Sequence, residues 1–424
     1  MEDPRLRGAH TRMNRRDFLV RSATAAAALS SAGVLLGACG GGDGGNGGTQ
    51  ASTIEVASPD NPATLPLDGR EPIESGLEPE AGPLKIYNWA DYIWPKVVKD
   101  FAEEQGIEFE ISTFYNIPEA VQKMRTGQVD FDVFFPTIDV VPKLVAGDLL
   151  QPLNHDYLPN LSKNVWPQLA DPFYDQGSLY TVPYTVYTTG IGWRTDMVDE
   201  DVASMDNPYE IFWNSKYSGK VGIYDDYREA ITMVLLKNGI TDINTHDASD
   251  IEMARKELVA LAEEVNVRTT IDGAYAKLPE GQFAIHQAWS GDMVAAPFYM
   301  PGKDYGDPRG LLQYWWPEDG RGTIGNDTIA IPKTAKNPVL AHMFLNYMLA
   351  NQPAIKNFSW VGYQPPVNAI DPDKLVRQQY VVPNLKPAIV EEQMFDTGFR
   401  QLALPPEVDA VWQNAWSEFK SGAS

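Results

Sequence analysis

Runs with strand-like spacing alternate with runs of helical spacing from residue 84 onward. Alternating or continuous apolar positions predict three strands, at residues 84–89, 108–113 and 131–135. Apolar positions three and four apart predict a helix after each strand, at residues 95–106, 118–126 and 141–147. Because each strand is followed by a helix, we predict an α/β region built on a mainly parallel sheet.

Longer helices are predicted in the second half of the chain. The clearest apolar stripe contains Ile251, Ala254, Leu258 and Leu261, and it predicts an amphipathic helix over residues 249–264. Further runs predict helices at residues 226–237 and 408–419 and a strand at residues 283–289. Several tryptophans are predicted to pack in the core and not to bind a ligand: Trp213, Trp315, Trp316, Trp412 and Trp416.

The N-terminus carries an export signal. Arg15 and Arg16 lie in a stretch that resembles a twin-arginine export motif. The apolar run that follows, residues 23–36, is shorter than the ~20 residues of a membrane span and ends in small residues before Cys39, as in a bacterial lipobox. We therefore predict a twin-arginine lipoprotein signal peptide over residues 1–38 and lipidation of Cys39.

Residues 39–83 are rich in glycine and proline and have little apolar periodicity. We predict that they form the lipidated cysteine and a flexible tether to the globular body. The predicted location is outside the cytoplasm, with the protein anchored by lipid in the periplasm or on the outer face of the cytoplasmic membrane.

The composition excludes several classes of function. The 424 residues suit two lobes or domains, and a net charge of −23 disfavours binding to nucleic acid. One cysteine leaves no disulfide within the chain, and the four histidines after residue 38 lack the spacing of metal ligands. The sequence contains no Gly-x-Ser-x-Gly, His-Glu-x-x-His or phosphate-loop motif. We therefore predict no enzymatic activity, no cofactor and no metal.

An acidic stretch with two tyrosines, Tyr224–Glu229, is the main candidate for chemistry. Asp226 and Glu229 are three residues apart and share one face of a helix, where carboxylates and aromatic rings suit an organic cation. The same pattern is also typical of a helix start, with Asp226 as N-cap and Glu229 as the third helical residue. On these six residues alone, the helix cap is the preferred interpretation.

Motifs along residues 84–424 occur in an order that resembles the bacterial spermidine/putrescine-binding proteins of polyamine ABC importers. They are Tyr-Asn-Trp at 87–89, Phe-Asp-Val-Phe-Phe-Pro-Thr at 131–137, Val-Pro-Tyr at 182–184, Gly-Ile-Gly at 190–192, Asp-Asp-x-Arg-Glu at 225–229, Asn-Asp-x-x-Ala-Ile-Pro at 326–332 and Gly-Tyr-x-Pro at 362–365. The resemblance rests on their combined order and spacing.

The resemblance implies a two-lobed type II periplasmic binding protein fold, in which each lobe is a mainly parallel sheet flanked by helices. Two strands would cross between the lobes, within residues 184–193 and 324–331. Lobe 1 would comprise residues 84–190 plus 325–372. Lobe 2 would comprise residues 191–324 plus 373–424.

The resemblance also implies a set of ligand-binding residues in the cleft between the lobes: Trp89, Asp91, Tyr92, Thr137, Asp139, Asp226, Glu229, Trp289, Asp327 and Tyr363. Three departures bear on specificity. Asp139 replaces an expected tyrosine, Gly325 replaces an expected tryptophan, and Arg400 could oppose a diamine if it faces the cleft. Without the family, Asp139 could instead cap a helix, Asp327 could be a turn residue, and the aromatics could be core residues.

The implied function is that of the solute receptor of an ABC importer, a monomer that binds spermidine or putrescine and delivers it to a membrane permease. One alternative is a receptor of the same fold for another cationic or zwitterionic solute. Two others belong to different classes, an exported lipoprotein hydrolase and a sensor subunit that presents its ligand to a membrane receptor.

Overall fold

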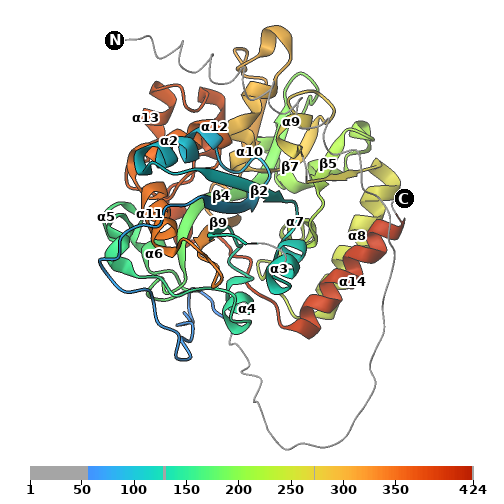
Figure 1. The fold of residues 1–424 in the computed structure, drawn as a ribbon. Helices are drawn as coiled ribbons and strands as arrows, with labels where there is room; N and C mark the ends of the chain where they lie inside the picture. Colours follow the sequence, from blue (N-terminus) through green and yellow to red (C-terminus); the bar gives the residue numbers. More distant parts are fainter. Residues whose placement is uncertain (1–55, 128–129, 272, 423–424) are drawn as a thin grey trace, which may run out of the picture. The chain divides into compact units, whose positions relative to one another are not determined.

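The computed structural model describes residues 56–127, 130–271 and 273–422 (Figure 1). The predicted export signal with Arg15 and Arg16, and the predicted lipidation site Cys39, lie outside these residues. Within the described part of the chain, no helix has both the length and the apolar character that a membrane span requires.

One sheet contains the strands of the described residues. The strands are β1 (Leu84–Trp89), β2 (Phe109–Phe114), β3 (Val133–Phe134), β4 (Thr181–Arg194), β5 (Val221–Tyr224), β6 (Arg268–Thr270), β7 (Ile285–Trp289), β8 (Leu312–Trp315) and β9 (Thr323–Ala330). Their order is β2-β1-β3-β9-β4-β7-β5-β6, and β8 pairs with β4. The predicted strands at 84–89, 108–113, 131–135 and 283–289 are confirmed, with small shifts at their ends.

Helices cover this sheet and connect its strands (Figure 1). They are α2 (Pro95–Gln105), α3 (Ile117–Arg125), α4 (Val141–Ala146), α5 (Pro159–Asn164), α6 (Pro167–Ala170), α7 (Tyr227–Lys237), α8 (Ala248–Val265), α9 (Ala274–Lys277), α10 (Ser290–Ala295), α11 (Pro338–Met348), α12 (Asn351–Val361), α13 (Pro372–Arg377) and α14 (Pro406–Gly422). The stripe predicted on residues 249–264 is the buried face of α8, which lies beside α14.

The strand directions divide the sheet into two mainly parallel halves. Strand β1 runs parallel to β2 and β3, and β5 runs parallel to β6 and β7. Between the two halves, the long strand β4 pairs antiparallel with both β9 and β7. This plan confirms the predicted α/β class, with β4 and β9 as the shared strands, whereas the lobe boundaries at residues 190, 324 and 372 stay predictions.

Residues 56–83 differ from the flexible tether predicted for them. Leu65 is 3% exposed and joins the core cluster that contains Tyr180. The Glu80 carboxylate accepts hydrogen bonds from the backbone N–H groups of Val339 (3.1 Å) and Leu340 (3.0 Å), at the start of α11. Because a helix N-terminus presents free N–H groups and partial positive charge, Glu80 holds this segment on the body. The tether prediction is therefore wrong for residues 56–83.

Candidate functional site

The candidate site lies on one face of the shared strands. In the antiparallel register, Thr185 is opposite Asp327, Tyr187 is opposite Gly325, and Thr189 is opposite Trp289. Side chains two residues apart on a strand share a face, and so do side chains directly opposite each other on neighbouring strands. The register therefore gathers these side chains on one face of the sheet.

Asp327 occupies one end of this face. Its Oδ2 atom accepts a hydrogen bond of 2.7 Å from the hydroxyl of Tyr92, which also lies 2.5 Å from the hydroxyl of Thr185. The other carboxylate oxygen, Oδ1, is buried without a hydrogen-bond partner. Burial raises the pKa of Asp327 to about 7, the bond from Tyr92 lowers it, and the charge of Asp139 adds to the rise.

Glu229 occupies the other end, on the first turn of α7. Its Oε1 atom accepts hydrogen bonds from the indole N–H of Trp289 (3.0 Å) and from the hydroxyl of Thr189 (3.3 Å). Its Oε2 atom is buried and lacks a partner. Burial, followed by the nearby charge of Asp226, raises the pKa of Glu229 to about 7. Each end of the face thus presents one buried carboxylate oxygen that can accept a hydrogen bond.

Asp226 is the N-cap of α7. Its Oδ1 atom accepts hydrogen bonds from the backbone N–H groups of Arg228 (2.8 Å) and Glu229 (3.1 Å), as the cap interpretation of the sequence predicts. Glu229 turns toward Trp289 instead of closing a capping box. The carboxylate of Asp226 is half-buried, and burial with the charge of Asp139 raises its pKa. Asp226 therefore caps α7 and also provides a second carboxylate close to Glu229.

Aromatic rings lie between the two ends. The ring of Tyr187 meets Trp289 at 6.2 Å and Tyr363 at 6.3 Å between centroids, in both cases edge to face. Tyr363 in turn meets Tyr92 at 4.9 Å, again edge to face. The rings extend from the tyrosine bonded to Asp327 to the tryptophan bonded to Glu229, and such rings can hold a cation or cover methylene groups.

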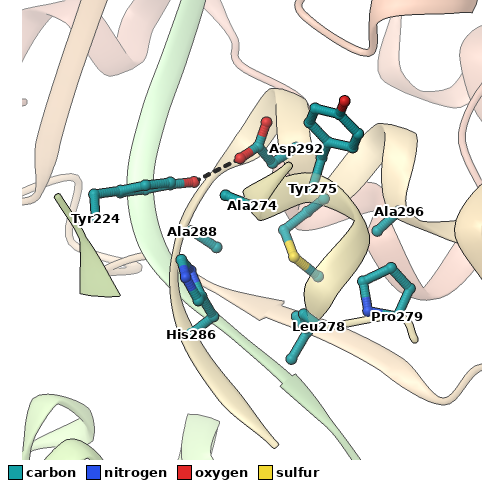
Figure 2. A pocket seen from close by; sticks show the side chains of 10 residues that line it. Tyr224, Ala274, Tyr275, Leu278, Pro279, His286, Ala288, Asp292 and Ala296 are labelled. Atoms are coloured by element: carbon teal, nitrogen blue, oxygen red, sulfur yellow. Dashed lines mark hydrogen bonds between the residues drawn. The ribbon is translucent and has the colours of Figure 1, made fainter. Parts of the chain in front are cut away.

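Tyr224 and Asp292 contact this row of aromatic rings. Tyr224 donates a hydrogen bond of 2.8 Å to Asp292 (Figure 2), and its ring stacks on Trp289 at 3.8 Å between centroids. Asp292 also accepts a hydrogen bond of 2.8 Å from Tyr363. A cavity of about 10 Å³ lies next to them and is also lined by Tyr275. This volume is about that of a single water site, so the cavity does not provide the space for an organic ligand.

Three further predicted site residues make contacts that differ from one another. Asp91 has a φ of +55° and accepts a hydrogen bond of 2.7 Å from the hydroxyl of Tyr275. Trp89 is half-buried and donates a bond of 3.2 Å to the carbonyl of Phe135. Thr137 forms a backbone bridge with Asp327, next to one end of the site.

The charge of Asp139 acts on carboxylates at both ends of the site. Asp139 is half-buried, and its charge contributes to the raised pKa values of both Asp226 and Asp327. The structure therefore gathers Tyr92, Thr137, Asp139, Asp226, Glu229, Trp289, Asp327 and Tyr363 around one region. Their role in binding stays a prediction.

Arg400 bonds to backbone carbonyls and packs against an aromatic ring. Its guanidinium donates hydrogen bonds to the carbonyls of Gly398 (2.9 Å) and Phe395 (2.6 Å), and lies 4.2 Å from the ring centroid of Phe395. Burial lowers the pKa of Arg400 to about 10. These backbone partners give the guanidinium a structural role.

The sequence reasoning missed several residues of the site, namely Thr185, Tyr187, Thr189 and Asp292. Strand β4 is almost wholly buried on both faces, so its apolar run does not show which side chains face the site. Gly325 gives a signal in hindsight, because a glycine inside a buried strand indicates that another group approaches closely.

A protein-family model and several known proteins are similar to this chain. A model of the family of bacterial extracellular solute-binding proteins matches residues 96–380. The spermidine/putrescine-binding periplasmic protein 1 of Haemophilus influenzae is 28% identical over 296 residues, which cover 69% of this chain and 77% of that protein. The putrescine-binding periplasmic protein PotF of Escherichia coli is 27% identical over 359 residues, which cover 82% of this chain and 93% of that protein.

Solved structures share the fold. The spermidine/putrescine ABC transporter substrate-binding protein PotD from Streptococcus pneumoniae aligns with a TM-score of 0.64 at 24% sequence identity. The alignment covers 80% of this chain and 99% of that chain. At this identity the likeness establishes the architecture, and the two-lobed type II fold is therefore confirmed.

Proposed function

Because the chain belongs to the family of bacterial extracellular solute-binding proteins, we propose that it is the receptor of an ABC importer and binds a polyamine between its two lobes. One observation carries the choice of ligand. Glu229 and Asp327 are both buried, and each keeps one oxygen without a hydrogen-bond partner. A ligand with two separated ammonium groups would supply a donor and a positive charge to both.

The energetics favour an organic polycation over a neutral solute. A buried ionised carboxylate is costly unless it is paired, and each charge-assisted hydrogen bond contributes about 1.5–3 kcal/mol. Each methylene covered by the rings adds about 0.8 kcal/mol, and a cation over an aromatic ring adds about 0.5–2 kcal/mol. These contributions must exceed an association cost of at least about 4 kcal/mol. A ligand with two or three ammonium groups and a methylene chain provides all of them.

Arg228, the basic residue nearest to the acidic pair in sequence, lowers the pKa of both Asp226 and Glu229 through its charge but directs its hydrogen bonds elsewhere. Arg228 donates hydrogen bonds to the carbonyl of Leu402 (2.8 Å) and to the side chain of Asn244 (2.6 Å). Its guanidinium also lies 4.9 Å from the ring centroid of Trp412. Because these partners take up the hydrogen bonds of Arg228, the free carboxylate oxygen of Glu229 is available to a cationic ligand.

Closure of the two lobes on the ligand is the proposed mechanism. Asp327 belongs to the shared strand β9, whereas Glu229 belongs to α7 beyond the shared strands. A polyamine bonded to both would stabilise the arrangement in which they face each other, and this differential affinity would drive closure. The hydrogen bond from Tyr275 to Asp91 would act as a direct clasp in the same state. The closed form would then deliver the polyamine to the permease.

We further propose that the protein is exported and anchored by lipid at Cys39, and that it acts as a monomer. The periplasmic location in the names of its relatives supports export. Substituting Cys39→Ser should release the protein from the membrane fraction, and mass spectrometry of the mature N-terminus should find an acylated Cys39 in the wild type. An unmodified Cys39 in membrane-bound protein would contradict the anchor and leave the ligand proposal intact.

Calorimetric titration of the purified protein tests the ligand proposal. The panel is putrescine, spermidine, spermine, arginine, glycine betaine and glucose, and we expect saturable binding of at least one polyamine. Asp327→Asn and Glu229→Gln should each weaken that binding about tenfold or more, because each removes one charged acceptor. Binding of betaine or glucose without a polyamine would refute the proposal.

A further inference from the structure

Tyr187 occupies the middle of the candidate site. It lies on β4 directly opposite Gly325 of β9, and its ring is half-buried. A Cβ atom at position 325 would lie 3.0 Å from both Cζ and the hydroxyl oxygen of Tyr187. Gly325 is not among the positive-φ glycines, so its backbone conformation does not require glycine. The absence of a side chain instead leaves room for the ring of Tyr187. The ring of Tyr187 therefore rests on the backbone of the neighbouring strand.

Four carboxylates act electrostatically on Tyr187. Burial raises the pKa of the Tyr187 phenol far above its usual value, and nearby negative charges raise it further. The contributing carboxylates are those of Asp327, Glu229, Asp139 and Asp226. A cation placed over the ring would thus be attracted by the aromatic face and by carboxylates from both ends of the site.

The strand register gives the spacing of the two threonines that lie beside the carboxylates. Thr185, which is opposite Asp327, and Thr189, which contacts Glu229, are four residues apart on β4. At a rise of about 3.3 Å per residue, they lie roughly 13 Å apart, with Tyr187 midway. With bonds of about 1.5 Å, an extended four-methylene diamine spans roughly 6 Å between its nitrogens, whereas a triamine with three and four methylenes spans roughly 11 Å between its terminal nitrogens.

We propose that Tyr187, resting on Gly325, makes the site selective for linear triamines. The terminal ammonium groups pair with Asp327 and Glu229, and the internal ammonium lies over the ring of Tyr187. A diamine reaches only one carboxylate and the ring, and a diamine of triamine length has no charge at the ring. The inference rests on the proposed function and specifies the chemical class of its ligand.

A matched pair of ligands isolates the role of the ring. Spermidine and 1,8-diaminooctane have the same chain length, but 1,8-diaminooctane has a methylene in place of the internal ammonium. We expect the wild type to bind spermidine more tightly than 1,8-diaminooctane, and to bind putrescine more weakly than spermidine. The variants Tyr187→Phe and Tyr187→Leu, with Tyr115→Leu as a control at an exposed tyrosine, are titrated calorimetrically with the same ligands.

The affinity ratio of spermidine to 1,8-diaminooctane is the decisive quantity. The Tyr187→Leu variant should lower this ratio about two- to thirtyfold, the range of a cation–aromatic contact, whereas Tyr187→Phe and Tyr115→Leu should preserve it. A general loss of packing would weaken both ligands and leave the ratio unchanged. The Gly325→Ala variant displaces the ring without removing it and should also lower the ratio. If Tyr187→Leu does not fold, the ratio measured for Gly325→Ala tests the role of the ring instead.

The outcomes separate this inference from the proposed function. An unchanged ratio in Tyr187→Leu overturns the role of Tyr187 and leaves polyamine binding intact. If Tyr187→Leu does not fold, an unchanged ratio in Gly325→Ala has the same consequence. Equal or tighter binding of putrescine by the wild type overturns triamine selectivity. Failure of the wild type to bind any of the three amines refutes the proposed function itself.

Discussion

Replacing Glu229 by glutamine should stabilise the ligand-free protein relative to the wild type, and this difference in stability should grow as the pH rises. The carboxyl group of Glu229 has a pKa of about 7 in the folded protein, against 4.5 as its ordinary value. Between these values the folded state binds more protons than the unfolded state, so the free energy of unfolding falls as the pH increases. Glutamine removes this dependence and keeps an oxygen that can accept from Trp289 and Thr189.

The magnitude follows from the pKa difference. One pKa unit corresponds to about 1.36 kcal/mol, so ionised Glu229 destabilises the folded protein by about 3 kcal/mol at pH 8 and by less than about 1 kcal/mol at pH 5. The stability of Glu229→Gln relative to the wild type should therefore increase by about 2–3 kcal/mol between these pH values. For a body of this size, that difference corresponds to about 3 °C in melting temperature.

Denaturant unfolding of both proteins at pH 5 and pH 8, without polyamine, measures this difference. The control is Glu263→Gln, which changes an exposed carboxylate on α8 and should have the same small effect at both pH values. Spermidine at saturating concentration should stabilise the wild type more than Glu229→Gln, because only the wild type carries the charged acceptor. A stability difference independent of pH, or one that decreases toward pH 8, would refute the reasoning.

Three further predictions concern binding, closure and the N-terminal segment. Spermidine affinity should increase from pH 6 to pH 8, because the carboxyl groups of Glu229 and Asp327 have pKa values of about 7 and bind the cation when ionised; a flat calorimetric pH profile would contradict this. Tyr275→Phe removes the bond to Asp91 and should weaken spermidine binding about two- to tenfold in calorimetry, whereas unchanged affinity would exclude a clasp. Glu80→Ala should lower the free energy of unfolding by about 1–2 kcal/mol in denaturant titrations without changing spermidine affinity; unaltered stability would mean that its two bonds to α11 contribute nothing.

Local patterns predicted the elements of the fold well. The stripe from Ile251 to Leu261 is the buried face of α8, and Asp226 caps α7 as its position before an apolar run indicates. Both features depend on residues a few positions apart, where helix geometry alone sets the contacts. The two strands that cross between the lobes were instead an implication of the family, because periodicity does not reveal which strands are neighbours.

Contacts between distant segments could not be predicted in the same way. Strand β4 is buried on both faces, so nothing in its apolar run distinguishes Tyr187 from the core residues beside it. Glu80 is far from α11 in sequence, and the polar segment around it has no periodicity that would reveal the contact. The backbone partners of Arg400 also depend on the folded position of residues 395–398. Such pairings follow from tertiary structure and not from local propensity.

A crystal structure of the protein with spermidine tests the central claim most directly. The account predicts one terminal ammonium within hydrogen-bond distance of Oε2 of Glu229 and the other within that distance of Oδ1 of Asp327, with the chain passing over Tyr187. Spermidine bound elsewhere, or bound without contact to either of these two carboxylates, would contradict the account.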